Sequence, residues 1–229
     1  EIVEVLNDQT LLLSGFLSQA QYGLKDLEGD ARKKELDGLK RAQNFEDIDE
    51  IPFYFNGTGF TAGKRNYLMI YDTKTEMIMP IHREDVSANS YRLDREHGRI
   101  LYVGSKITSK KPLTHQIYTY YYEKQTHENL YINDDYSIQG VFVLNDEIIV
   151  RASDMKDYGI NQNGSFYRLR NQKLEFLTSF DQGFGNSIGS DCRLLGSQSY
   201  FVSQGKLYFT ATIDDHSELF SLDQMGVIE

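Results

Sequence analysis

Short runs of β-branched and aromatic residues recur along the whole chain and are separated by polar turns. Runs of this kind are typical of β-strands. Four of them resemble one another and begin at residues 68, 117, 166 and 219, at spacings of 49, 49 and 53 residues. A spacing that repeats along a chain indicates a repeated structural unit.

Three further strand types accompany these four runs, in the same order each time. The strand before each run covers residues 11–13, 100–102, 148–150 and 207–209, and the one before that covers 1–6, 87–93, 138–144 and 198–203. The strand after each run covers 76–80, 128–132, 173–178 and 227–229. Polar hairpin turns join neighbouring strands, for example at residues 144–146. The strands therefore fall into four groups of four.

Four short strands in a repeat of about 50 residues are typical of a β-propeller blade. One four-stranded sheet cannot bury both of its faces alone, whereas stacked sheets can. We therefore predict an all-β fold, a β-propeller with four blades of four antiparallel strands and a helical insertion in the first blade. Residues 1–229 form a single domain in this prediction, with blades at 1–80, 87–132, 138–178 and 198–229, as a partial propeller or a small ring. A β-sandwich with accidental spacing is the alternative.

The insertion covers residues 19–66. Its residues 24–42 are rich in Lys, Glu, Leu and Ala and predict a solvated surface helix, although Gly29 and Gly38 weaken it. Residues 45–60 then combine an aromatic cluster with Asn-Gly and Thr-Gly turns. This loop is either a packing plug, which we favour, or a binding surface. Tyr54 and Asn56 are its candidate residues for contacting a substrate or lining a cavity.

The composition narrows the functional classes. Of the 229 residues, 40% are hydrophobic and 13% aromatic, enough to bury a core, so intrinsic disorder is excluded. The net charge of −10 disfavours binding to nucleic acid. Cys192 has no partner for a disulfide within the chain. No apolar run is long enough to cross a membrane, and no signal peptide opens the chain. We expect a cytoplasmic protein without a cofactor or metal ion and, because the chain starts at Glu1, a fragment of a longer one.

Three segments carry a resemblance to a known family. They are residues 49–60 (DEIPFYFNGTGF), residues 64–72 (KRNYLMIYD) and residues 187–193 (SIGSDCR). They resemble the N-terminal propeller of acylaminoacyl-peptidase-like enzymes in the prolyl oligopeptidase family of serine peptidases. The resemblance covers roughly residues 45–229. Its most specific parts are the segment with Ile-Pro before three aromatic residues and the Gly-Ser-Asp segment at 189–191.

The resemblance implies a function for the chain. Members of the family place a propeller of seven or eight blades over an α/β-hydrolase domain, and the propeller admits peptides while excluding folded proteins. Four blades leave no room for a hydrolase domain. The resemblance therefore implies a non-catalytic propeller segment that gates and positions peptide substrates for a serine peptidase domain outside the chain. The alternative is a stand-alone propeller-like module that binds a protein or a ligand. An open arc of blades would also self-associate through its exposed faces.

The sequence offers few catalytic candidates. Residues 185–189 match the G-x-S-x-G pattern around Ser187, but no helix is predicted after this serine, and a nucleophile elbow requires one. Asp215 and His216 follow in the order of a catalytic triad, but they are adjacent in a short hairpin. We interpret the motif as a connection between blades. Asp191 and Arg193 are a charged pair in this Gly/Ser-rich connection. They either join blades through a salt bridge, which we favour, or face the central cavity. Some members of the family present a propeller arginine to the substrate, but no motif assigns that role to Arg193.

Overall fold

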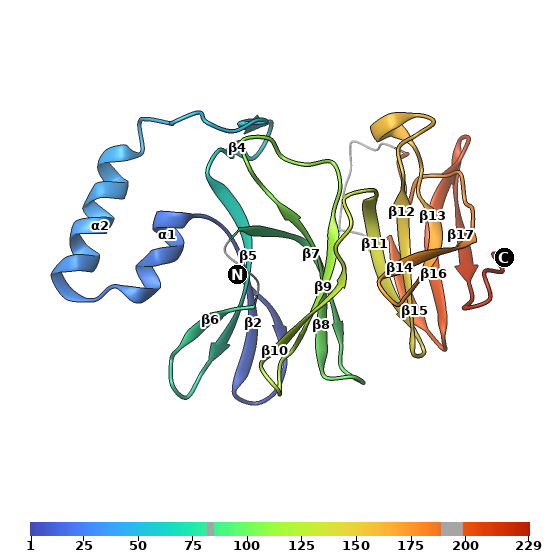
Figure 1. Ribbon diagram of the computed structural model, residues 1–229, viewed down its shortest axis with the longest axis horizontal. Coiled ribbons are helices and arrows are strands. Elements are labelled where there is room, and N and C mark those ends of the chain that lie inside the picture. Colours follow the sequence, from blue (N-terminus) through green and yellow to red (C-terminus); the bar gives the residue numbers. More distant parts are fainter. Residues whose placement is uncertain (82–84, 189–198) are drawn as a thin grey trace. The chain divides into compact units, whose positions relative to one another are not determined.

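The computed structural model describes residues 1–81, 85–188 and 199–229, and antiparallel β-sheets dominate it (Figure 1). The chain divides into two compact units. The N-terminal unit comprises Glu1–Asn89 and Gly104–Pro112, and the C-terminal unit comprises Ser90–Val103 and Leu113–Glu229. The prediction of an all-β fold is confirmed, whereas the single-domain organisation and the number of blades stay predictions.

The first sheet has the strand order β1-β2-β5-β6 and belongs to the N-terminal unit. Its strands are β1 (Ile2–Val5), β2 (Thr10–Ser18), β5 (Lys64–Asp72) and β6 (Ile78–Pro80). Strands β2 and β5 pair along their whole lengths, from Thr10 opposite Asp72 to Ser18 opposite Lys64. The insertion therefore leaves and re-enters the sheet at one end of this strand pair.

The insertion begins with helix α1 (Gln19–Gly23), the 3₁₀ turn η1 (Leu24–Asp26) and helix α2 (Gly29–Ala42). Ser18 caps α1 through a reciprocal pair of hydrogen bonds with Gln21. The predicted surface helix is confirmed, since no residue of α2 is buried. It begins at residue 29 rather than 24, because Leu27 and Glu28 are extended and interrupt the helix. Strands β3 (Tyr54–Phe55) and β4 (Gly59–Phe60) then form a small hairpin.

Helix α1 packs on one face of the first sheet. The ring of Tyr22 lies parallel to that of Tyr67 on β5, with 4.2 Å between the ring centroids. Met69 completes the buried cluster, and Leu13 and Leu17 of β2 pack against it. The start of the insertion is thereby fixed to the sheet, while α2 stays exposed to solvent.

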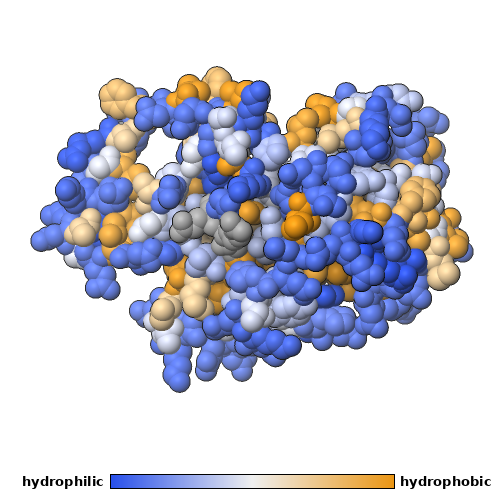
Figure 2. Space-filling view, viewed as in Figure 1, coloured by the Kyte–Doolittle hydropathy of each residue, from blue (hydrophilic) through white to orange (hydrophobic). Residues whose placement is uncertain are grey.

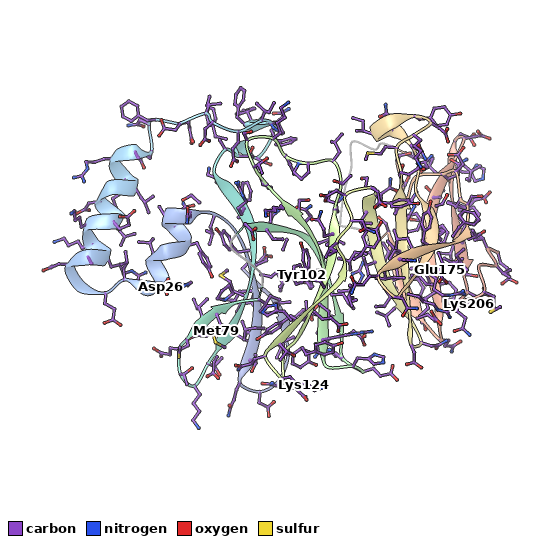
Figure 3. All side chains as sticks on the ribbon, viewed as in Figure 1. Asp26, Met79, Tyr102, Lys124, Glu175 and Lys206 are labelled. Atoms are coloured by element: carbon purple, nitrogen blue, oxygen red, sulfur yellow. The ribbon has the colours of Figure 1, made fainter. Side chains whose placement is uncertain are left out.

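Three further sheets follow in chain order. The second sheet contains β7 (Val86–Asp94), β8 (Arg99–Lys106), β9 (Gln116–Tyr121) and β10 (Thr126–Tyr131). The third contains β11 (Ser137–Leu144), β12 (Glu147–Ser153), β13 (Ser165–Arg170) and β14 (Lys173–Thr178), with the 3₁₀ turn η2 (Gly159–Asn161) between β12 and β13. The fourth contains β15 (Tyr200–Ser203), β16 (Lys206–Ile213) and β17 (His216–Leu222). In the second sheet, Tyr102 of β8, labelled in Figure 3, stacks on Tyr118 of β9.

The fourth sheet differs from its prediction at the end of the chain. Residues 227–229 were expected to form its outer strand, but the sheet has three strands in the part of the chain that the structure describes. Ile228 instead forms an isolated antiparallel bridge with Leu222. The backbone groups of Ser221 and Glu229 exchange two hydrogen bonds of 2.8 and 3.0 Å, so the end of the chain still lies along β17.

Sheets in the C-terminal unit pack face to face through apolar side chains. One buried cluster joins the second and third sheets, and its members include Val103, Ile117 and Val150. A second cluster joins the third and fourth sheets, and it includes Phe166 and Phe209. The third sheet therefore buries one face against the second sheet and the other against the fourth, as stacked propeller blades do.

Candidate functional site

The first strands of three successive sheets share a pocket in the C-terminal unit. We call it the first-strand pocket. It has a volume of about 470 Å³ and takes residues from β7, from β11 and from the start of the fourth sheet. Its lining residues are Arg92, Leu93, Val143, Ser199, Tyr200, Phe201 and Val202. Blades of a propeller surround a central channel, and a pocket shared by the first strands is the arrangement expected of strands that face such a channel.

Arg92 gives this pocket its charge. Its guanidinium carbon lies 4.3 Å from the ring centroid of Tyr200 and 5.8 Å from that of Phe142. Its Nε donates a hydrogen bond of 3.3 Å to the carbonyl of Val141. Burial lowers the pKa of Arg92 below its usual value, although an arginine remains protonated at neutral pH. A planar cation held against an aromatic ring is suited to bind a carboxylate or a carbonyl oxygen.

A second arginine, Arg151 of β12, is a structural contact rather than a pocket residue. It is 5% exposed, and its guanidinium donates to the carbonyls of Gly164 at 3.3 Å and Gln182 at 2.6 Å. It also lies 4.1 Å from the ring centroid of Phe184, and burial lowers its pKa to about 10. Arg151 therefore ties the connection between the third and fourth sheets to β12.

The candidates predicted from sequence lie in different places. Asp191 and Arg193 fall outside the residues that the structure describes. Tyr54 and Asn56 lie on the β3–β4 hairpin of the N-terminal unit, beside a second cavity. Neither is among the residues that line this cavity, and their role stays a prediction. The sequence did not single out Arg92, whose only signal is a charged residue within a predicted strand.

The described residues of the G-x-S-x-G motif are hydrogen-bonded to β16. Ser187 is exposed, and its N–H donates a 2.8 Å hydrogen bond to Oγ1 of Thr212. His216 contacts the exposed carboxylates of Asp215 and Glu218, at 3.1 and 2.7 Å. In the segments that the structure describes, the motif therefore attaches to β16 as a connection between sheets.

The residues that the structure describes lack both a metal-binding cluster and a membrane-spanning helix. No group of three or more His, Cys, Asp and Glu side chains is arranged to hold a metal ion. Within residues 1–81, 85–188 and 199–229, no helix combines the length and the apolar character that a membrane-spanning segment needs.

Comparisons with solved structures show which known proteins have a similar fold. No protein-family model and no curated protein sequence matches the chain. Among solved structures, acylaminoacyl peptidase from Pyrococcus horikoshii in an orthorhombic crystal form matches with a TM-score of 0.58 over 96% of this chain. The chain has the fold of one part of acylaminoacyl peptidase. An acylaminoacyl peptidase in complex with Z-Gly-Gly-Phe-chloromethyl ketone matches with a TM-score of 0.55 over 94% of this chain.

The similarity to acylaminoacyl peptidase is a similarity of fold over one part of that protein. Sequence identity is 16% to both of these structures, so the similarity concerns the fold. The chain spans 29% of the length of each peptidase. At the level of the fold, these structures confirm the resemblance seen in the sequence.

Proposed function

We propose that this chain is the propeller part of a serine peptidase similar to acylaminoacyl peptidase, and that it gates and positions peptides for an α/β-hydrolase domain. The observation that carries the proposal is the first-strand pocket, in a fold that matches this peptidase over 96% of the chain. A peptide carries carbonyl oxygens, a terminal carboxylate and apolar side chains. Arg92 supplies a partner for the oxygens, while Leu93, Val143 and Phe201 offer an apolar wall.

The ligand of one structural neighbour suggests the probe. That acylaminoacyl peptidase is in complex with Z-Gly-Gly-Phe-chloromethyl ketone, an N-blocked peptide analogue that ends in an aromatic side chain. The unreactive acid Z-Gly-Gly-Phe presents the same blocked chain and a free carboxylate. Its binding to the purified 229-residue chain is measured by saturation-transfer NMR and by calorimetry.

Replacement of Arg92 separates peptide binding in this pocket from binding elsewhere. Arg92→Met keeps much of the apolar stem and removes the charge, and we expect it to weaken binding by about 10-fold, the effect of losing one charged hydrogen bond. Arg32→Met, on the exposed helix α2, is the matched control and leaves binding unchanged. Equal affinities of the Arg92→Met variant and the unmodified chain would contradict the proposed role of the pocket.

The peptidase assignment has a separate test. We expect the gene to encode an α/β-hydrolase domain with a Gly-x-Ser-x-Gly motif beyond residue 229, and the isolated chain to leave N-acetyl-alanine p-nitroanilide intact. Hydrolysis that Ser187→Ala abolishes would refute the interpretation of residues 185–189 as a connection. A stop codon at residue 229, together with a stably bound partner, would favour the alternative of a stand-alone binding module.

Two further parts of the proposal concern the environment of the chain. We infer a cytoplasmic location, and we infer that open sheet faces support concentration-dependent dimers. Exposed apolar side chains on the last strands, such as Phe201 and Leu219, support self-association. Light scattering that finds only a monomer at high concentration would contradict it.

A further inference from the structure

A groove in the N-terminal unit lies beside the β3–β4 hairpin. We call it the hairpin groove. It has a volume of about 440 Å³, within the range of roughly 300–1,000 Å³ that is typical of small-ligand sites. Its apolar lining consists of Phe16, Ile51, Pro52, Phe55 and Ile107. Its polar lining consists of Glu50, Thr58, Thr61, Lys64, Arg65, Asn66, Ser87 and Lys111.

Hydrogen bonds between distant segments fix the walls of the hairpin groove. Ile51 forms a parallel bridge with Lys110: its N–H donates to the carbonyl of Ser109 at 3.0 Å, and its carbonyl accepts from the N–H of Lys111 at 2.9 Å. The base of the hairpin is closed by Thr61, whose N–H donates to the carbonyl of Phe53 at 2.8 Å. The groove is therefore held by backbone contacts before a ligand binds.

The charges of the hairpin groove do not cancel. Both Nη atoms of Arg65 donate to the Glu50 carboxylate, so these two groups neutralise each other. Nζ of Lys64 donates to the neutral carbonyl of Phe60, and Nζ of Lys111 lies 5.8 Å from the ring centroid of Phe55. Among the described residues, neither lysine forms a salt bridge. Two lysines that have no ion-pair partner among the described residues thus line the groove, in a chain whose net charge is −10.

Aromatic side chains around the hairpin groove are exposed. Phe53, Tyr54, Phe55 and Phe60 have exposed fractions between 38% and 51%. Figure 2 shows hydrophobic side chains gathered on the surface at the top of the view, where Figure 1 places the hairpin. An exposed apolar patch with a polar rim is typical of a binding site. This exposure favours a binding surface as the role of residues 45–60.

We propose that the hairpin groove binds an extended peptide segment in which a bulky apolar side chain lies between carboxylates. The apolar floor accommodates the side chain, and Lys64 and Lys111 pair with the flanking carboxylates. Two lysines are too few to hold a nucleic-acid backbone against the repulsion from a net charge of −10. The proposal is independent of the function proposed for the first-strand pocket. Every residue that lines the hairpin groove belongs to the N-terminal unit, whereas the first-strand pocket belongs to the C-terminal unit.

The test uses three fluorescein-labelled peptides and the full 229-residue chain. The first peptide contains Asp-Phe-Glu, the second Asn-Phe-Gln and the third Asp-Ala-Glu, each between Gly-Ser flanks and with a blocked C-terminus. Fluorescence anisotropy gives the affinity at low and at high salt. We expect the first peptide to bind best, the second to bind about 4–25-fold more weakly, since each exposed charge pair contributes about 2–5-fold, and added salt to weaken the first. We expect the third to bind about 10-fold or more weakly, the effect of losing one buried phenyl group.

Substitutions locate the peptide. The double variant Lys64→Gln/Lys111→Gln reduces affinity for the Asp-Phe-Glu peptide to that of the Asn-Phe-Gln peptide. The control Lys34→Gln/Lys173→Gln removes the same charge from exposed positions on α2 and β14 and leaves affinity within about two-fold, because exposed charges far from a ligand are screened. Thermal unfolding confirms that both variants are folded.

Three results of the binding experiments would overturn the proposal. They are equal affinity for the Asp-Phe-Glu and Asn-Phe-Gln peptides, undiminished affinity in the Lys64→Gln/Lys111→Gln variant, and absence of binding at millimolar peptide. A dimer in light scattering that the same double variant dissociates would also overturn it, since a second copy of the chain would then occupy the groove.

Discussion

Phe209 lies at the centre of the aromatic cluster between the third and fourth sheets, and its removal tests how these sheets are held together. Its side chain is 0% exposed. Its ring stacks on Phe184 at 4.4 Å between centroids and meets Phe180 edge-on at 5.1 Å. Phe166 and Phe220 lie at 5.9 and 5.8 Å. Phe209→Ala therefore removes four ring contacts and leaves a cavity.

The expected loss in free energy of unfolding follows from these ring contacts. Truncation of a buried phenylalanine to alanine typically costs about 3–5 kcal/mol, and each favourable ring pair contributes about 0.5–1.5 kcal/mol beyond burial. With four pairs lost, we expect Phe209→Ala to lower the free energy of unfolding by about 4–5 kcal/mol. Phe209→Leu keeps most of the buried volume and loses the ring pairs, so we expect a loss of about 1–3 kcal/mol. Phe176→Ala, at a position that is 65% exposed, is the control and costs less than about 1 kcal/mol.

Two measurements test the predicted destabilisation of the Phe209 variants. Urea unfolding followed by circular dichroism gives the free energy of unfolding. Hydrogen exchange then shows where protection is lost, which matters because the chain has two units. We expect faster exchange in β12 and β16, which flank the cluster. A loss below about 1 kcal/mol for Phe209→Ala, or one equal to that of Phe176→Ala, would refute the conclusion that ring packing holds these sheets together.

Two further predictions concern charged pairs. The hydrogen bond to Asp94 raises the pKa of His97, so this pair stabilises the fold below a pH of about 6.5, the ordinary histidine value, and the stabilisation is lost as pH rises through the raised pKa. His97→Asn should therefore lower the urea midpoint at pH 5.5 but not at pH 9, and an equal loss at both would contradict this linkage. The hydrogen bonds from Arg65 lower the pKa of Glu50, so this carboxylate stabilises the fold above a pH of about 4.5, and the contribution is lost as pH falls through the lowered pKa. Glu50→Gln should cost about 1 kcal/mol at pH 7 and speed proteolysis within residues 45–61, and unchanged cleavage there would show that the pair does not hold the hairpin.

The strand periodicity was sufficient to predict the all-β fold, because most strands pair with the next strand in the sequence. Turn residues such as Asn145 and Gly205 mark the hairpins, and both adopt a positive φ in the structure. Periodicity could not predict the end of the fourth sheet. Three residues were too few to distinguish a strand from the single bridge between Leu222 and Ile228.

The pockets were harder to predict because they depend on pairings between distant segments. Glu50 and Lys111 line one groove only because Ile51 bridges Lys110, and nothing in the sequence between them indicates this pairing. Arg92 and Arg151 lie inside predicted strands, and each guanidinium contacts an aromatic ring and a backbone carbonyl. The only signal in the sequence for these two arginine contacts was a charged residue among the apolar or small residues of a predicted strand.

The β3–β4 hairpin shows the limit of an argument from hydrophobicity. The aromatic side chains of residues 45–60 favour burial away from water, but their hydrophobicity does not specify which part of the protein, or which ligand, covers them. Strand alternation turns neighbouring residues to opposite sides, so Phe55 lines the groove while Tyr54 does not and instead meets Phe60 edge-on at 5.3 Å. The sequence therefore pointed to the segment that lines the groove, but not to the aromatic residue that faces it. If the proposed peptide binds, Phe55 should become protected from solvent, and Tyr54, on the other side of the hairpin, should not.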